Sequence, residues 1–248
     1  MVPLPIQSTT VTLTSSALAI PAYVAAPTAA GSFPGVVVIQ EVFGVNAHIR
    51  DVADRLAAMG YVAIAPHLYH RQVVNFEVGY SEADLALGRQ YKDGTRADQL
   101  LSDIQSAIAY LTHSPKVKSS GVGCLGFCFG GHVAYLAATL PEIKAAACFY
   151  GAGITTMTPG GGDPTLSLTA QIGGTFYGFF GDADPLIPLQ QVDQIEAALT
   201  QYGIPHRIFC YPGAGHGFFC DQRYSYQAEA AQDAWQQILK LFAATLTA

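Results

Sequence analysis

Short apolar runs alternate with longer stretches of helical periodicity along most of this 248-residue chain. The run Gly35–Gln40 has the continuous apolar character of a central strand that is buried on both faces. Between Ile49 and Leu56, apolar residues then recur at i, i+3, i+4 and i+7, which predicts a helix that ends at Gly60. Such alternation favours a mostly parallel sheet covered by helices on both faces.

The pattern continues along the whole chain. Seven more strands are predicted, over Thr10–Thr14, Ala19–Val24, Tyr61–Ala65, Gly121–Gly126, Ala145–Tyr150, Thr175–Phe180 and Arg207–Tyr211. Four more helices are predicted, one with Thr95 as its N-cap and the others over His132–Thr139, Leu189–Tyr202 and Ala228–Leu246. The Gly- and Thr-rich segment Gly151–Gly174 is expected to be irregular and on the surface. We therefore expect one α/β domain over residues 1–248, with about eight strands in a three-layer sandwich.

Charge and composition narrow the range of partners. Twelve Lys and Arg against eighteen Asp and Glu give a net charge of −6, without a basic run that could neutralise a nucleic-acid backbone. The first basic residue is Arg50, so the N-terminus lacks the charged start of a signal peptide. Every apolar run is far shorter than the roughly 20 residues that span a bilayer. Five cysteines do not suggest a disulfide framework, so we expect a cytoplasmic protein. From the charge and the short apolar runs, we expect neither a nucleic-acid nor a membrane partner.

The segment Gly126-Phe127-Cys128-Phe129-Gly130-Gly131 joins a predicted strand to a predicted helix. This pattern is that of a nucleophile elbow with cysteine in place of the usual serine. Such a sharp turn crowds the neighbours of the nucleophile, so that only glycine fits at the flanking positions. The helix N-terminus behind the thiol favours the thiolate through its dipole. Cys128 is therefore the candidate nucleophile, and a buried cysteine in a glycine-rich turn is the alternative.

An elbow of this kind needs an acid and a base that follow it in the chain, each at the carboxyl end of a later strand. His216 lies among glycines after the strand Arg207–Tyr211 and is the candidate base. Two acids follow the strand Thr175–Phe180, of which Asp184 precedes the Pro-containing segment that opens the next helix, whereas Asp182 suits a turn. Asp184 is therefore the expected acid.

Five motifs follow one another along the chain, at Gln40–Asn46, Ala65–Tyr69, Gly126–Gly131, Gly181–Asp184 and Gly215–Phe218. Together they resemble the dienelactone hydrolase family of α/β-hydrolases, from the N-terminal strands to the last helix. The resemblance implies an α/β-hydrolase fold. It also implies that Cys128, Asp184 and His216 form a catalytic triad.

The resemblance assigns further roles to Glu41 and to two backbone donors. Glu41 is implied to contact the resting thiol of Cys128 and to take its proton when substrate binds. A carboxylate at the end of an apolar strand is also costly to bury without a partner or a task, and a solvated loop acid is the alternative. The oxyanion hole is expected from the backbone N–H groups of Val42 and Phe129.

The substrate side departs from the family pattern. Family members that act on chlorocatechol-derived lactones hold the substrate carboxylate with two arginines, one of them four residues after the catalytic His. Cys220 stands at that position here, and the nearest arginine is Arg223. Arg89 matches the other arginine only with an alignment shift. Arg223, Arg89 and Arg71 remain candidate contacts, with Tyr91 as a candidate lining residue.

Other chemically capable residues have simpler explanations. His67 and His70 are spaced i, i+3, but two histidines without further ligands do not define a metal site. His132, on the helix after the elbow, suits packing or capping. Neither a metal nor a cofactor is expected. Three cysteines in predicted strands are expected to be buried small hydrophobes: Cys124, Cys148 and Cys210.

The expected activity is hydrolysis of a lactone or another activated carboxylic ester through a Cys-His-Asp triad and an acyl-thioester. Two other functions stay open: a non-catalytic binder of a small hydrophobic carbonyl compound, and a broader carboxylesterase. A thiol redox sensor is disfavoured, because the nearest cysteine, Cys124, is predicted to be buried. The expected partner is a small lactone or ester, and the expected state is a monomer or weak homodimer.

Overall fold

The fold is built on an eight-stranded sheet that is packed between helices. The computed structural model describes residues 3–15 and 18–247. The strands are β1 (Ile6–Ser15), β2 (Leu18–Pro27), β3 (Phe33–Ile39), β4 (Val62–Pro66), β5 (Val117–Phe127), β6 (Ile143–Phe149), β7 (Thr175–Gly181) and β8 (His206–Tyr211). The helices are α1 (Ala47–Ala58), α2 (Glu82–Asp93), α3 (Ala97–His113), α4 (Phe129–Ala137), α5 (Leu189–Gln201) and α6 (Ala228–Leu246), with a short 3₁₀ helix, η1 (Thr165–Gln171).

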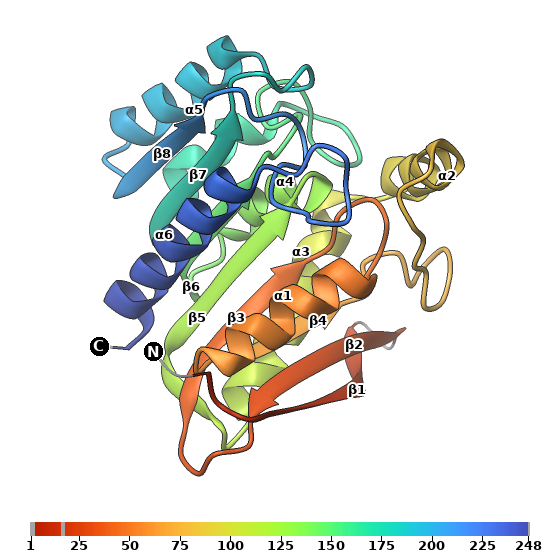
Figure 1. The fold of residues 1–248 in the computed structure, drawn as a ribbon, viewed down its shortest axis with the longest axis vertical. Coiled ribbons are helices and arrows are strands. Elements are labelled where there is room, and N and C mark those ends of the chain that lie inside the picture. The colour runs from red at the N-terminus through yellow and green to blue at the C-terminus, as the bar shows by residue number, and fades with distance from the viewer. Residues whose placement is uncertain (1–2, 16–17, 248) are drawn as a thin grey trace.

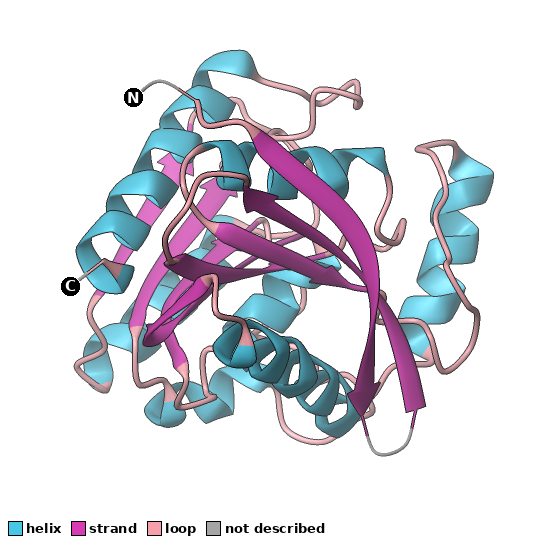
Figure 2. Ribbon diagram, turned by 90° about the horizontal axis from the view of Figure 1, so that it is seen from below, coloured by secondary structure: helices cyan, strands magenta, loops and turns pink. Residues whose placement is uncertain are grey.

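The sheet is mixed, with the strand order β1-β2-β4-β3-β5-β6-β7-β8. Among the described strands, β1 with β2 and β2 with β4 pair antiparallel, and all pairs from β4 to β8 are parallel. Figure 1 shows α1 and α6 in front of the sheet and α3 and α4 behind it, and Figure 2 shows how the sheet twists between these layers. Because both faces are covered, the side chains of Val36–Ile39 in β3 are fully buried. The predicted three-layer fold is confirmed.

All eight predicted strands and five predicted helices are present, but the apolar pattern does not predict α2. Of the α2 residues only Gly88 is buried, and just two apolar side chains, Leu85 and Tyr91, are partly buried, so the sequence shows no clear apolar stripe. Its start is set by a capping box, in which the Ser81 hydroxyl accepts from the N–H of Asp84 and the Asp84 carboxylate accepts from the N–H of Ser81. Figure 1 shows α2 apart from the other helices.

The expectation that Thr95 is an N-cap is wrong. Helix α3 has Arg96 as its N-cap residue, without a side-chain capping hydrogen bond. The Thr95 hydroxyl instead donates to the carbonyl of Lys92, at 2.7 Å, and so closes the preceding helix α2. Thr95 was assigned to the wrong helix because α2 carries no apolar signal.

The segment Gly151–Gly174 is more ordered than its composition predicts. It contains η1, whose Thr165 and Thr169 are buried. His132 of α4 holds this segment, because its Nδ1–H donates to the carbonyl of Ala152 at 3.0 Å and its Nε2 lies 2.7 Å from Thr165 Oγ1. Burial lowers the pKa of His132 to about 4, so the ring is neutral, and the predicted packing role is confirmed.

The cysteines in strands divide between the core and the surface. Cys124 and Cys148 are buried, as predicted, but Cys210 is exposed. Cys210 lies on β8, which is the edge strand of the sheet, and an edge strand has fewer neighbours to cover it. Among the described residues, no helix is both long and apolar enough to cross a membrane.

A buried charge cluster joins the loop after β4 to α3. The fully buried Asp103 carboxylate accepts hydrogen bonds from both terminal nitrogens of Arg71, one of them at 2.8 Å, and lies 3.0 Å from Nε2 of His70. Arg71 is thus the counter-ion of a core carboxylate. The expected contact of Arg71 with substrate is not supported, because Arg71 is not among the residues that line the cavity with Cys128.

We predict that Arg71→Ala lowers the free energy of unfolding by about 3–5 kcal/mol, because it leaves the Asp103 charge buried without its partner. Urea unfolding followed by circular dichroism measures this loss. The control is Arg96→Ala, whose exposed pair with Asp98 is expected to contribute less than about 1 kcal/mol. Equal unfolding midpoints for the two variants would contradict the assignment.

Candidate active site

The nucleophile elbow forms where β5 runs directly into α4. Cys128 at this turn has φ +56° and ψ −116°, a region that side-chain-bearing residues rarely occupy. A Cβ on Gly126 would lie 1.9 Å from the carbonyl oxygen of Gly130, and a Cβ on Gly130 would lie 2.4 Å from the carbonyl oxygens of Ile39 and Gln40. Glycine is therefore required at both positions, and the start of α4 rests against the end of β3.

Asp184 follows β7, His216 follows β8, and the fold brings their side chains together. Nδ1 of His216 donates to Asp184 Oδ2 at 2.8 Å, and the other carboxylate oxygen accepts from the N–H of Leu186 at 2.8 Å. Asp182 instead accepts from the N–H of Gly213 at 2.6 Å, between two loops. The geometry thus gives Asp184 the position of a histidine-orienting acid and Asp182 a position that stabilises a turn.

Electrostatics couple His216 to the elbow. Burial lowers the pKa of His216, but the sulfur of Cys128 and the carboxylate of Asp184 raise it more, to about 10. A thiolate on Cys128 therefore favours the charged imidazolium, and the two groups form an ion pair once the thiol has lost its proton. Nε2 of His216 has no oxygen or nitrogen partner within the described part of the chain, and the group it interacts with is the Cys128 side chain, so this nitrogen is available to a reacting group.

Two backbone N–H groups are free at the same place. Val42 and Phe129 both line the cavity that contains Cys128. Within residues 3–15 and 18–247, neither N–H donates a hydrogen bond, although Phe129 opens α4 and Val42 follows β3. These two N–H groups can donate hydrogen bonds to a developing oxyanion.

Glu41 is fully buried and forms an ion pair. Its Oε1 accepts from Nη1 of Arg223 at 3.1 Å, and the guanidinium lies 5.7 Å from the ring centres of both Phe43 and Tyr80. Between the described side chains of Glu41 and Cys128 there is no hydrogen bond, so the expected contact with the thiol is absent in this state. The half-buried Arg223 cation holds the carboxylate instead.

The cavity in front of Cys128 and His216 has a volume of about 660 Å³. One wall comes from α2 and includes Leu85, Arg89 and Lys92, and another comes from the segment Gly151–Gly174 and includes Met157 and Pro159.

Arg223 also lines this cavity, so two of the candidate arginines, Arg89 and Arg223, reach the site. Tyr91 does not, because its ring packs against Tyr69 and Phe76, with ring centres 5.9 and 4.7 Å away.

Tyr150 belongs to the site but did not emerge from the sequence. It follows β6, has φ +37°, and its ring meets the His216 ring edge-on at 5.2 Å. Its buried hydroxyl has no hydrogen-bond partner among the described residues, and burial raises its pKa well above the usual value. The available signal was its place at the carboxyl end of a central strand, where site residues of parallel sheets gather.

One set of side chains could be considered for a metal. Donor atoms of Glu41, His48 and Cys220 lie within 4.8 Å of one another, whereas His67 and His70 join no such group in the described chain. Burial raises the pKa of the Cys220 thiol to about 11, and this thiol donates to the Tyr80 hydroxyl at 3.2 Å. A protonated thiol beside the Arg223 cation is a poor metal site.

The elbow, the acid after β7 and the histidine after β8, all at the carboxyl edge of a mostly parallel sheet, are those of an α/β-hydrolase. The chain belongs to the dienelactone hydrolase family, whose sequence profile matches residues 20–246. It is a hydrolase that acts on lactones or esters.

Similar proteins cover nearly the whole chain. A Synechocystis protein named "Putative carboxymethylenebutenolidase" is 53% identical over 237 residues, or 96% of each chain. A Bradyrhizobium protein named "Probable 2-oxo-3-(5-oxofuran-2-ylidene)propanoate lactonase" is 31% identical over 222 residues, which are 88% of this chain and 86% of that protein. A crystal structure named "Putative Dienelactone Hydrolase", from Klebsiella pneumoniae, is 33% identical with a TM-score of 0.85, over 96% of this chain and 99% of that one.

We predict that Cys128→Ser lowers the pKa of His216, because it removes the strongest of the influences that raise it to about 10. NMR titration of the imidazole measures the shift. In the wild type the ring pKa exceeds the ordinary 6.5, so its contribution to stability is complete below that pH and is lost as pH rises towards 10. The exposed Cys210→Ser is the control, and an equal His216 pKa in both variants would count against the coupling.

Proposed function

We propose that Cys128, His216 and Asp184 form a catalytic triad that hydrolyses lactones and activated carboxylic esters. The proposal depends above all on the 2.8 Å hydrogen bond that orients His216 on Asp184, while the ring is electrostatically coupled to Cys128 in one cavity. A pure binding protein has no need for a strained cysteine, an oriented histidine and two free backbone donors in one place.

In the first half-reaction, the Cys128 thiolate attacks the carbonyl carbon of the substrate. The carbonyl oxygen becomes an oxyanion that accepts hydrogen bonds from the N–H groups of Val42 and Phe129, each typically worth roughly 3 kcal/mol. The bond from carbon to the ring or ester oxygen then breaks, and that oxygen takes the proton of the His216 imidazolium. An acyl-thioester on Cys128 remains.

In the second half-reaction, neutral His216 takes a proton from water, and the hydroxide attacks the thioester carbon. The carbon–sulfur bond breaks, which releases the carboxylic acid and restores the thiolate beside an imidazolium. A thiolate is itself a good leaving group, so the first intermediate goes forward only when the departing oxygen is stabilised. Enol-lactones and activated esters fit this requirement, and simple alkyl esters and amides do not.

Glu41 and Arg223 are proposed to link substrate binding to thiol activation. Arg223 lines the cavity, whereas Glu41 does not, so a substrate carboxylate can approach Arg223 and compete with Glu41 for it. The released Glu41 would then take the thiol proton of Cys128, and would return it to the thiolate after the product leaves and Glu41 pairs with Arg223 again. Arg89 and Lys92 add positive charge to the same cavity. The Bradyrhizobium relative supports this substrate class, since the compound in its name has an oxofuran ring and a carboxylate.

The whole chain is proposed to form one domain that works in the cytoplasm. Strands that share one sheet run from Ile6 to Tyr211, which supports a single domain over residues 1–248. All five cysteines are free thiols, which fits a reducing cytoplasm. A monomer or weak homodimer without a nucleic-acid or membrane partner completes the proposal.

We predict that the wild type hydrolyses an activated ester or a dienelactone and that Cys128→Ala lowers kcat by roughly 10⁴-fold or more, because the nucleophile is lost. Steady-state kinetics measure the loss, and mass spectrometry of quenched reactions detects the acyl-thioester. Cys210→Ala is the control and keeps wild-type activity. A folded wild type without turnover and without acyl-thioester would favour the non-catalytic binder.

We predict a preference for lactones that have a carboxylate. Arg89→Ala should raise KM about tenfold for a carboxylate-bearing lactone and leave a neutral ester unaffected, because only the first has a charge for the guanidinium to bind. Arg96→Ala, at a position outside the residues that line the cavity, is the control. Equal KM values for charged and neutral substrates in the wild type would point to a broader carboxylesterase.

A further inference from the structure

The second oxygen of Glu41 is buried and unused. The side chain is fully buried, and Oε1 accepts from Arg223, but Oε2 has no hydrogen-bond partner among the described residues. A buried carboxylate oxygen without a partner is costly, by about 1–3 kcal/mol or more for a charged group. Since Glu41 does not line the catalytic cavity, water in that cavity does not reach this oxygen directly.

His48 is the nearby group with a matching unused atom. It lies in the first turn of α1 and is 2% exposed, and within the described chain its Nε2 also lacks a hydrogen-bond partner. A ring nitrogen of His48 and a carboxylate oxygen of Glu41 lie within 4.8 Å of each other. A single water or a small side-chain shift can bridge such a gap. The neighbouring Cys220 thiol is already committed to the Tyr80 hydroxyl.

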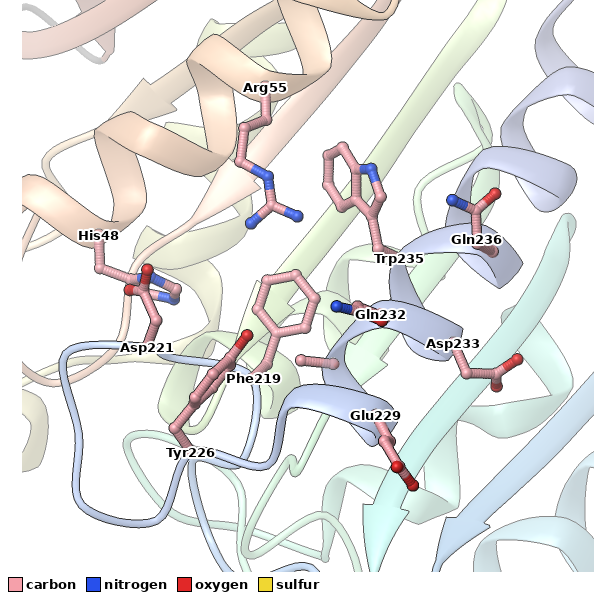
Figure 3. A pocket seen from close by; sticks show the side chains of 11 residues that line it. His48, Arg55, Phe219, Asp221, Tyr226, Glu229, Gln232, Asp233, Trp235 and Gln236 are labelled. Atoms are coloured by element: carbon pink, nitrogen blue, oxygen red, sulfur yellow. The ribbon is translucent and has the colours of Figure 1, made fainter. Parts of the chain in front are cut away.

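His48 also lines a second hollow, which we call the α1–α6 groove. This groove, of about 450 Å³, is lined by His48, Arg55, Phe219, Asp221, Tyr226 and Trp235, among others. It shares no lining residue with the catalytic cavity. Figure 3 shows His48 and Asp221 at the same end of the groove, and Arg55 reaching from α1 towards Trp235, 4.2 Å from its ring centre. His48 therefore stands between buried Glu41 and solvent.

We infer that His48 is a positioning residue that holds Glu41 Oε2 and exchanges its proton with water in the α1–α6 groove. The inference rests on the proposed function, in which Glu41 takes the thiol proton of Cys128. Once Oε2 carries the thiol proton, it donates a hydrogen bond to the unprotonated Nε2 of His48. The proton then passes to Nε2 while the proton on Nδ1 passes to a groove water, which leaves an Nε2–H that donates to the ionised Oε2. The reverse sequence returns a proton to Glu41, and no net charge stays in the interior.

This route matters when a substrate fills the catalytic cavity and excludes water from it. Proton exchange at the front of the site is then blocked, but the groove at the back stays open. The thiol chemistry in the cavity is thereby connected to solvent through an opening that the substrate does not occupy.

The charges around His48 suit such exchange. Burial lowers the pKa of His48, and Arg55 lowers it further, whereas Glu41, Asp221 and Asp51 raise it without cancelling the effect of burial. The ring is therefore neutral at pH 7, with one nitrogen that donates and one that accepts. A neutral imidazole can receive a proton on one side and release another on the opposite side.

The test compares kcat at saturating carboxylate-bearing lactone, the substrate that frees Glu41 from Arg223, in the wild type, His48→Gln and His48→Ala. Gln fills the space and can donate to Glu41 but cannot transfer a proton, so we expect kcat to fall about tenfold or more with little change in KM. Ala leaves a hole open to the groove, so added imidazole should restore kcat of His48→Ala in a saturable manner. Imidazole should not restore activity to Glu41→Gln/His48→Ala. Circular dichroism checks that each variant is folded.

The control is His113→Gln, an exposed histidine at the end of α3, which should keep wild-type kcat. Wild-type kcat in His48→Gln, or a loss in folded His48→Ala that imidazole does not restore, would overturn the role of His48 alone, because the wild type would still form its acyl-thioester. An inactive wild type without acyl-thioester would overturn the proposed function and this inference together.

Discussion

The close approach of backbone atoms at the elbow is the constraint on which the rest of the site depends. Gly126 and Gly130 allow β5 to turn into α4 with no space for a Cβ, and the same contact presses α4 against the last carbonyls of β3. The loop that begins after β3 is thereby brought beside Cys128. One packing requirement thus places the nucleophile, the helix N-terminus behind it and both backbone donors, Val42 and Phe129.

Charges complete the arrangement in two layers. In front, the Asp184 carboxylate holds the His216 ring, which lines the cavity together with Cys128. Behind, Arg223 holds the buried Glu41. Glycine at position 217 makes room for this ion pair, because a Cβ there would lie 2.3 Å from the Arg223 guanidinium. Arg223 is the element shared by the two layers, since it pairs with Glu41 and also lines the cavity.

Much of this structure could be predicted from the sequence, for identifiable reasons. Periodicity predicts elements that bury an apolar face, so every strand and every helix of that kind was found. Helix α2 was not, because Gly88 is its one buried residue and only Leu85 and Tyr91 add partly buried apolar side chains, too few for a periodic signal. The pairing of Arg71 with Asp103 was not predicted, because the two are 32 residues apart and only the fold brings them together. Tyr150 and His48 were missed for the same reason: spacing in the chain does not reveal contacts between distant segments.

Gly88 is the point at which the α2 wall of the cavity touches the catalytic centre, and this limits how α2 can vary in evolution or protein engineering. A Cβ at Gly88 would lie 2.4 Å from the carbonyl oxygen of Val42, so α2 rests directly on the backbone that carries an oxyanion donor. Elsewhere, the wall residues of α2 are separate from the strand ends that carry Cys128 and His216. Sequence variation on the cavity face of α2 can therefore alter which molecules enter while the chemistry is preserved, provided that position 88 stays glycine.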